Sequence, residues 1–184
     1  MKNKRLNKKG MTLVEMLAAV LIIALLAAGM SAGMTSGMRV YASASFQSTS
    51  SSLAANINTT LSDILRYASK YTPLDAEGAP GFLITNLEYG MDNCYIECPP
   101  YDEETTPEGG ILRICYWREN SADARAPKAL VNSGSYGNLR VTDFTINPKS
   151  DAQGHYFEIS YRIISTTDAA SSRDVKTIVR MMNQ

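Results

Sequence analysis

The most prominent hydrophobic pattern in the chain is an uncharged run of 23 residues at positions 16–38. As an α-helix this run would be about 34 Å long, which is enough to cross the hydrocarbon core of a bilayer. Its apolar residues are most concentrated before Ala28, and glycine, serine and threonine follow. The pattern therefore predicts a membrane-spanning helix of moderate hydrophobicity.

A second helical pattern occupies positions 39–72. Apolar residues recur there in steps of three and four, which predicts an amphipathic helix with one face to bury. Serine crowds positions 43–52 and is a weak helix former, so the helix is expected to bend or fray near 48–52. Pro73 is expected to end the helix, because the residue before a proline avoids helical geometry. The apolar stripe consists of Leu53, Ile57, Leu61, Ile64, Leu65, Ala68 and Tyr71.

Residues 73–184 have the pattern of short strands separated by turns. The clearest strand is 156–164, where apolar residues from Phe157 to Ile163 alternate with polar ones. Such alternation is typical of an antiparallel sheet that is covered on one face, and the amphipathic helix is its natural cover. We therefore predict an α+β fold, a long N-terminal helix packed on a β-rich head. The predicted strands are 82–87, 94–98, 111–117, 139–146, 156–164 and 175–181.

Charge is unevenly distributed, although the formal net charge is zero. Residues 1–10 contain five basic residues and no acidic one. Removing those five from the chain's 18 basic residues leaves 13 against 18 acidic ones, a net charge of −5. A basic leader before an acidic body is typical of a membrane-orienting segment on an exported head. Nothing in the charge pattern indicates a nucleic-acid site.

Three cysteines, Cys94, Cys98 and Cys115, cannot form a closed set of disulfides, because their number is odd. In a regular strand Cys94 and Cys98 would be about 13 Å apart, too far to bridge each other. Cys115 lies on the next predicted strand and could meet either one, and a single bridge suits a head outside the membrane. A zinc site is disfavoured because the chain's one histidine, His155, is remote in sequence.

Enzyme chemistry is poorly supported by the sequence. Any serine or cysteine triad would have to use His155, which follows a predicted turn with no acid or nucleophile placed beside it. The segment 133–137 is one residue away from a nucleophile elbow and does not match it. The acidic run 102–104 lacks the alternating ligand spacing of a calcium loop. We therefore predict a protein that is not an enzyme and uses neither a metal nor another cofactor.

The most informative stretch is Lys9-Gly10-Met11-Thr12-Leu13-Val14-Glu15. Glu15 places a carboxylate at the start of the apolar run, where an ionisable group is costly and usually has a role or a partner. An ordinary secretory signal would have an uncharged apolar core followed closely by a small-residue cleavage site. The pattern Ala42-Ser43-Ala44 suits such a site but lies well beyond the end of the apolar run.

These residues resemble the cleavage and methylation motif of type IV prepilins and type II secretion pseudopilins. In that family a membrane peptidase cuts after the glycine and N-methylates the new amine. The resemblance implies cleavage between Gly10 and Met11, N-methylation of Met11, and a Glu15 that is the fifth mature residue. Met11 stands where the family usually has phenylalanine. The head resembles minor pseudopilins of the J class in its length and around Leu61-Leu65-Arg66.

The family's assembly model gives Glu15 a role. An unpaired carboxylate in a dry helical bundle is costly, and the terminal amine on Met11 of a neighbouring subunit would compensate it. Gly29, Gly33 and Gly37 form a series of small residues at four-residue spacing. This series either lets helices approach closely or simply loosens the helix.

The resemblance thus implies a structural subunit of a type IV pilus or of a secretion or competence pseudopilus. Its parts would be a leader (1–10), an assembly helix (11–38), an amphipathic helix (39–72) and a head (73–184). The expected partners are other subunits, prepilin peptidase, an inner-membrane assembly platform and the membrane. The expected location is a single pass in the cytoplasmic membrane with the head outside, then an extracellular or periplasmic filament. The alternative is a tethered or secreted binding domain that uses the apolar segment only for export.

Overall fold

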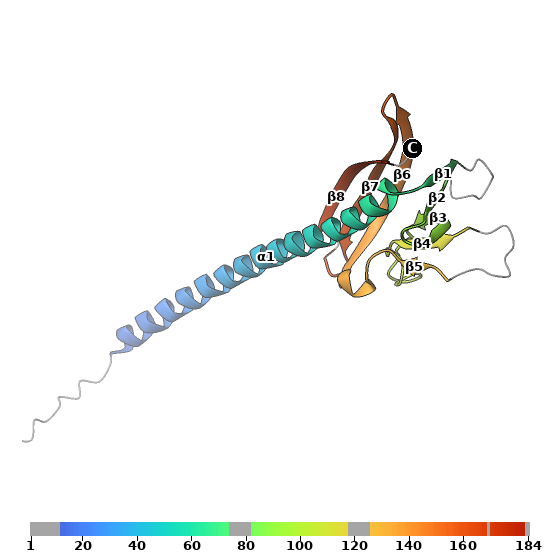
Figure 1. The fold of residues 1–184 in the computed structure, drawn as a ribbon. Coiled ribbons are helices and arrows are strands. Elements are labelled where there is room, and N and C mark those ends of the chain that lie inside the picture. The colour runs from blue at the N-terminus through green and yellow to red at the C-terminus, as the bar shows by residue number, and fades with distance from the viewer. Residues whose placement is uncertain (1–11, 74–81, 118–125, 169, 183–184) are drawn as a thin grey trace, which may run out of the picture. The chain divides into compact units, whose positions relative to one another are not determined.

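The computed structural model describes residues 12–73, 82–117, 126–168 and 170–182. The chain divides into two units, Met1–Ser45 and Phe46–Gln184. Helix α1, Leu13–Arg66, continues from the first unit into the second, and all strands belong to the second unit (Figure 1). Among the described residues, α1 is the one helix whose length and composition would allow it to cross a membrane.

The serine-rich part of α1 is helical without a break, so the fraying that the sequence predicts near residues 48–52 is not observed. Its hydroxyl groups bond to backbone carbonyls of the preceding turn and leave the helical backbone intact. The Thr49 hydroxyl donates to the Phe46 carbonyl at 3.2 Å. The Ser52 hydroxyl donates to the Ser48 carbonyl at 3.1 Å. Each of these hydroxyls thus has a partner inside the helix, and α1 continues through the serine-rich part despite the weak helix propensity of serine.

The C-terminal end of α1 differs from the prediction. The helix ends at Arg66, and strand β1, Lys70–Pro73, occupies positions that the sequence assigns to the helix. The Ser69 backbone N–H donates to the Thr85 carbonyl at 2.8 Å, which directs the chain into the sheet. Pro73 therefore closes a strand rather than a helix. It is tolerated because β1 lies at the edge of its sheet, where a proline need not donate to a neighbour.

The predicted single sheet is two antiparallel sheets, with order β1-β2-β3-β4-β5 in one and β6-β7-β8 in the other. All six predicted strands are present with shifted ends, and β6 runs through Pro148, beyond the predicted end at residue 146. Strands β1 and β5 were not predicted from the sequence. The remaining bounds are β2 Phe82–Asn86, β3 Met91–Glu97, β4 Arg113–Tyr116, β5 Lys128–Ala129, β6 Leu139–Asp151, β7 Gly154–Ser165 and β8 Ser172–Arg180.

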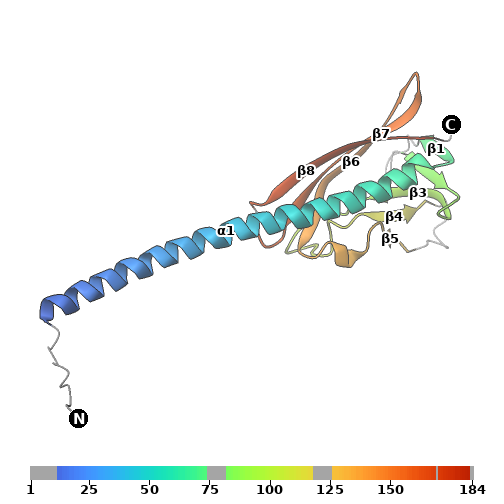
Figure 2. The ribbon, with the colours of Figure 1, turned by 60° about the vertical axis from the view of Figure 1, so that its left-hand side comes forward.

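The second half of α1 packs against both sheets, and Figures 1 and 2 show it running alongside them. Its buried stripe lies in one hydrophobic core with residues of β2, β3, β4, β6, β7 and β8. Buried polar groups tie the helix to each sheet. The Tyr161 hydroxyl donates to Asn58 Oδ1 at 3.0 Å, and Asn86 Nδ2 donates to the Ile64 carbonyl at 3.0 Å. The predicted cover of the sheet by the amphipathic helix is confirmed, and the cover extends to a second sheet.

Leu61 is 0% exposed at the centre of this stripe. We expect a head that lacks the first 38 residues to fold, and Leu61→Ala to lower its free energy of unfolding by about 2–5 kcal/mol through lost burial and a residual cavity. Thr59→Ala, at an exposed position of the same helix, serves as the matched control. Its effect should stay within about 0.5 kcal/mol. Denaturant melts would measure the free energy of unfolding of both variants. Equal effects of the two changes would show that Leu61 is not part of the core.

Candidate functional site

The N-terminus of α1 contains the part of the predicted site that the structure describes. Gly10 and Met11 lie outside the described residues, whereas Glu15 is in the first turn of the helix. The backbone N–H of Thr12 donates to Glu15 Oε2 at 2.8 Å, and the Thr12 hydroxyl donates to the same oxygen at 3.0 Å. In return the Glu15 N–H donates to Thr12 Oγ1 at 3.3 Å. These reciprocal bonds form a capping box.

The capping box gives Glu15 a local role that the sequence analysis does not assign to it. Its signal, threonine followed three residues later by glutamate, is visible in the sequence. The carboxylate also lies at the positive end of the helix dipole, which favours a negative charge there. Glu15 therefore bonds to Thr12 of its own chain, and these bonds partly offset the cost of its charge at the start of an apolar segment.

Beyond this cap, the apolar side chains of the first unit are exposed. Leu17, Ile23 and Leu26 are 63%, 64% and 61% exposed. A Cβ added to Gly29, Gly33 or Gly37 would meet nothing within 4 Å outside the local helix. An apolar surface of this extent marks a region that contacts lipid or another protein.

Comparison with known proteins concerns this same segment. Residues 5–31 match the family model described as the prokaryotic N-terminal methylation motif. The chain carries a prepilin-type methylation motif. No curated protein and no solved structure matches the chain.

The methylation motif is consistent with a prepilin or pseudopilin family, and it includes Gly10, Met11 and Glu15. The long apolar helix packed on antiparallel sheets is likewise a pilin-like arrangement. Proteins with this motif are structural rather than enzymatic, and the motif with the apolar helix fits membrane anchoring. The match ends at residue 31, so the likeness of the head to the J class stays a prediction.

The three cysteines do not have the geometry that the sequence suggests. Cys115 lies on the strand next to that of Cys94, as predicted, but Cys94 pairs with Tyr116 and Cys115 pairs with Tyr95. Directly paired residues share a face and successive residues alternate, so Cys94 and Cys115 lie on opposite faces of the sheet. No disulfide joins the three residues. Burial raises the pKa of the Cys98 thiol to about 11 and that of Cys115 to about 12.

His155 has a partner that sequence reasoning missed. Ser150 and His155 are paired across the β6–β7 hairpin, and Ser150 Oγ lies 2.7 Å from His155 Nδ1. The imidazole ring also contacts the ring of Tyr71, with centroids 5.6 Å apart. Within the described part of the chain, no carboxylate hydrogen-bonds to His155, so this pair has no third member of a triad there. The contacts join the hairpin to strand β1.

The acidic loop is organised by its own backbone. Asp102 Oδ1 accepts the backbone N–H groups of Glu104 at 2.9 Å and Thr105 at 3.1 Å. These bonds, led by that from Thr105, lower the pKa of Asp102. Such a turn is a common use of an aspartate in a loop. Among the described residues, no group of three potential metal ligands is found.

The capping box is testable by hydrogen exchange. We expect Thr12→Ala to destabilise the first turn of α1 by about 0.5–2 kcal/mol, the usual cost of losing an N-cap side chain. The amides around Glu15 should then exchange several-fold faster in the full chain in detergent micelles. Thr35→Ala is the matched control, because the Thr35 hydroxyl only bonds to the Ser31 carbonyl inside the same helix. Equal exchange in all three proteins would contradict the cap.

Proposed function

We propose that this protein is a structural subunit of a type IV pilus or of a type II secretion or competence pseudopilus. The observation that carries the proposal is an exposed apolar helix whose first part falls in the methylation motif at residues 5–31 and whose first turn is capped by Thr12 and Glu15. The head supports it, because the core of the second unit is already complete without the residues before Phe46. The described side chains of α1 before Phe46 take no part in this core.

The proposed pathway from synthesis to filament has two stages. In the first, α1 crosses the cytoplasmic membrane once, with the basic segment 1–10 inside and the head outside, as the positive-inside rule favours. In the second, prepilin peptidase removes residues 1–10, and an inner-membrane platform adds the subunit to a filament. In this scheme 11–38 is the assembly helix and 39–72 the segment that joins it to the head, although the helical part ends at Arg66.

Processing gives the first test. We expect the mature chain to begin at Met11 and to carry an N-methyl group, which mass spectrometry of the N-terminal peptide would detect. Replacement of Gly10 by a bulky residue should leave the leader attached, because the proposed cut follows this residue. An N-terminus beyond Ala28 would instead support the alternative, an exported binding domain that loses its apolar segment.

The role proposed for Glu15 is to pair with the Met11 amine of a neighbouring subunit. In a bundle of low dielectric such a pair favours one register over random apolar association. The capping box complicates any test, because a change at Glu15 can alter both the charge and the first turn of α1. A glutamine retains the capping geometry without the charge, whereas a valine retains neither.

We therefore expect both Glu15→Gln and Glu15→Val to be inserted and cleaved but to assemble poorly, because each removes the charge that meets the incoming amine. Thr12→Ala keeps the carboxylate and should assemble far better than either. Sheared filament fractions would measure assembly, or secretion and DNA uptake where the filaments are short. Normal assembly by a stable, correctly cleaved Glu15→Gln protein would show that capping, not charge, is the contribution of this residue.

A further inference from the structure

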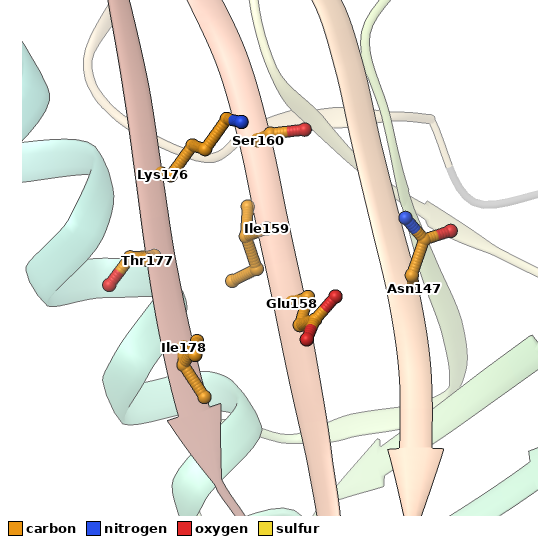
Figure 3. Close-up of a pocket in the computed structure, with 7 residues that line it drawn as sticks. All are labelled: Asn147, Glu158, Ile159, Ser160, Lys176, Thr177 and Ile178. Carbon is orange, nitrogen blue, oxygen red and sulfur yellow. The ribbon is translucent and has the colours of Figure 1, made fainter.

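Two hollows on the head are large enough to be considered as binding sites. The larger, about 670 Å³, lies on the exposed face of the β6–β8 sheet (Figure 3). Its side chains carry both signs of charge, and Glu158 already pairs with Lys149 at 2.7 Å. The lining of this hollow therefore favours neither a cation nor an anion. The second hollow, a cleft of about 420 Å³ between β3 and β6, is lined mainly by aromatic and aliphatic side chains.

This cleft opens where two strands separate. The pairing of β2 with β3 reaches Ile84 and Cys94 and does not continue to Phe82 and Ile96, which both line the cleft. On the other side of the cleft, Cys98, the first residue after β3, is held against β6, because its thiol donates to the Val141 carbonyl at 3.4 Å. The gap between the sheets is therefore fixed by contacts on β3 and β6.

Aromatic side chains from different elements line the cleft: Phe82, Tyr95, Trp117 and Phe144. Trp117 is anchored by its backbone, whose N–H donates to the Asn93 carbonyl at 2.7 Å. Its ring meets that of Tyr95 edge to face, with centroids 6.4 Å apart. Phe144 contacts the buried ring of Tyr161. These contacts hold the rings in place before a ligand arrives, which lowers the entropic cost of binding.

Among the described residues that line the cleft, Glu97 is the one with a carboxyl or basic side chain. Burial raises the pKa of Tyr95 to about 12 and that of Cys98 to about 11, so both are uncharged near neutral pH. Arg113 faces Glu97 across the β3–β4 pair but does not line the cleft. In the described part of the chain, no ion pair involves Glu97.

The chemistry of the cleft selects a particular class of ligand. The faces of aromatic rings attract cations, and a carboxylate adds a full negative charge. Ile96 and Ile146 supply apolar wall beside them. Lysine and arginine side chains combine an aliphatic stem with a cationic head and match both features. We propose that this cleft binds a lysine or arginine side chain presented by a partner protein. The site is independent of filament assembly and of the roles proposed for Met11 and Glu15.

Trp117 is the chain's only tryptophan, so its fluorescence reports directly on the cleft. The test uses the full chain in a nonionic detergent at low ionic strength. The probes are N-acetyl-lysinamide and N-acetyl-argininamide, with the uncharged N-acetyl-norleucinamide as the matched control. We expect a saturable change with the two cations and at least tenfold weaker binding of norleucinamide. Equal binding of all three would make the cleft a site for neutral ligands, and no saturable change with either cation would overturn the proposal.

Substitutions test the contribution of the Glu97 charge to binding separately from that of the aromatic rings. Glu97→Gln should weaken the binding of both cations about tenfold, and Phe144→Leu should weaken it several-fold while keeping an apolar wall. Glu158→Gln, which removes a carboxylate from the other hollow, should leave the affinity unchanged. Thermal melts would verify that each variant is folded. An unchanged affinity in a folded Glu97→Gln protein would contradict the proposed cation site.

Discussion

Burial of one stripe of helix α1 is the interaction on which the head depends. Leu53, Ile57, Leu61 and Leu65 are each at most 1% exposed, and they share a core with the inner residues of both sheets. Removal of apolar surface from water is the main favourable contribution to such an arrangement. The two sheets therefore share one helix as a common wall, and the hydrogen bonds from Tyr161 and Asn86 fix where each sheet meets it.

This constraint explains why a single helix has two patterns of polarity. After Phe46 the apolar residues form a stripe, because only one side faces the core. Before that point Leu17, Ile23 and Leu26 are exposed, and the helix has apolar side chains without a core to cover. A bilayer or a bundle of like helices can cover such a surface. The methylation motif at residues 5–31 overlaps the first part of this exposed segment.

Local patterns predicted most of the fold. The amphipathic stripe and the six predicted strands, among which 156–164 shows the clearest alternation, follow from patterns among near neighbours in the sequence. Strand β1 was missed because Tyr71 continues the spacing of the helical stripe, whereas the bond from Ser69 to distant Thr85 and the pairing of β1 with β2 direct the chain into the sheet. The division into two sheets was likewise not predictable, because the choice of strand partner is made between residues far apart in sequence.

The two candidate sites also differ in how far apart in sequence their residues lie. The motif around Glu15 is contiguous, so its chemistry was visible in the sequence, and even its capping box has a local signal. The cleft gathers Phe82, Tyr95 and Phe144 from three strands, with Trp117 after a fourth. No spacing in the sequence relates these residues. They come together because the β2–β3 pairing stops at Ile84 and Cys94, and because Cys98, just after β3, bonds to Val141 of β6.

Capping and intersubunit pairing are compatible roles for a single carboxylate. An ionised glutamate has two oxygens with about four positions for hydrogen bonds. The two bonds from Thr12 both go to Oε2 of Glu15. They tie the side chain to the first turn and so reduce the rotamer entropy that a later ion pair would otherwise remove. In the proposed filament, the cap would thus prepare the carboxylate for the amine of the next subunit, and the same residue would order its own helix before assembly and align its neighbour during it.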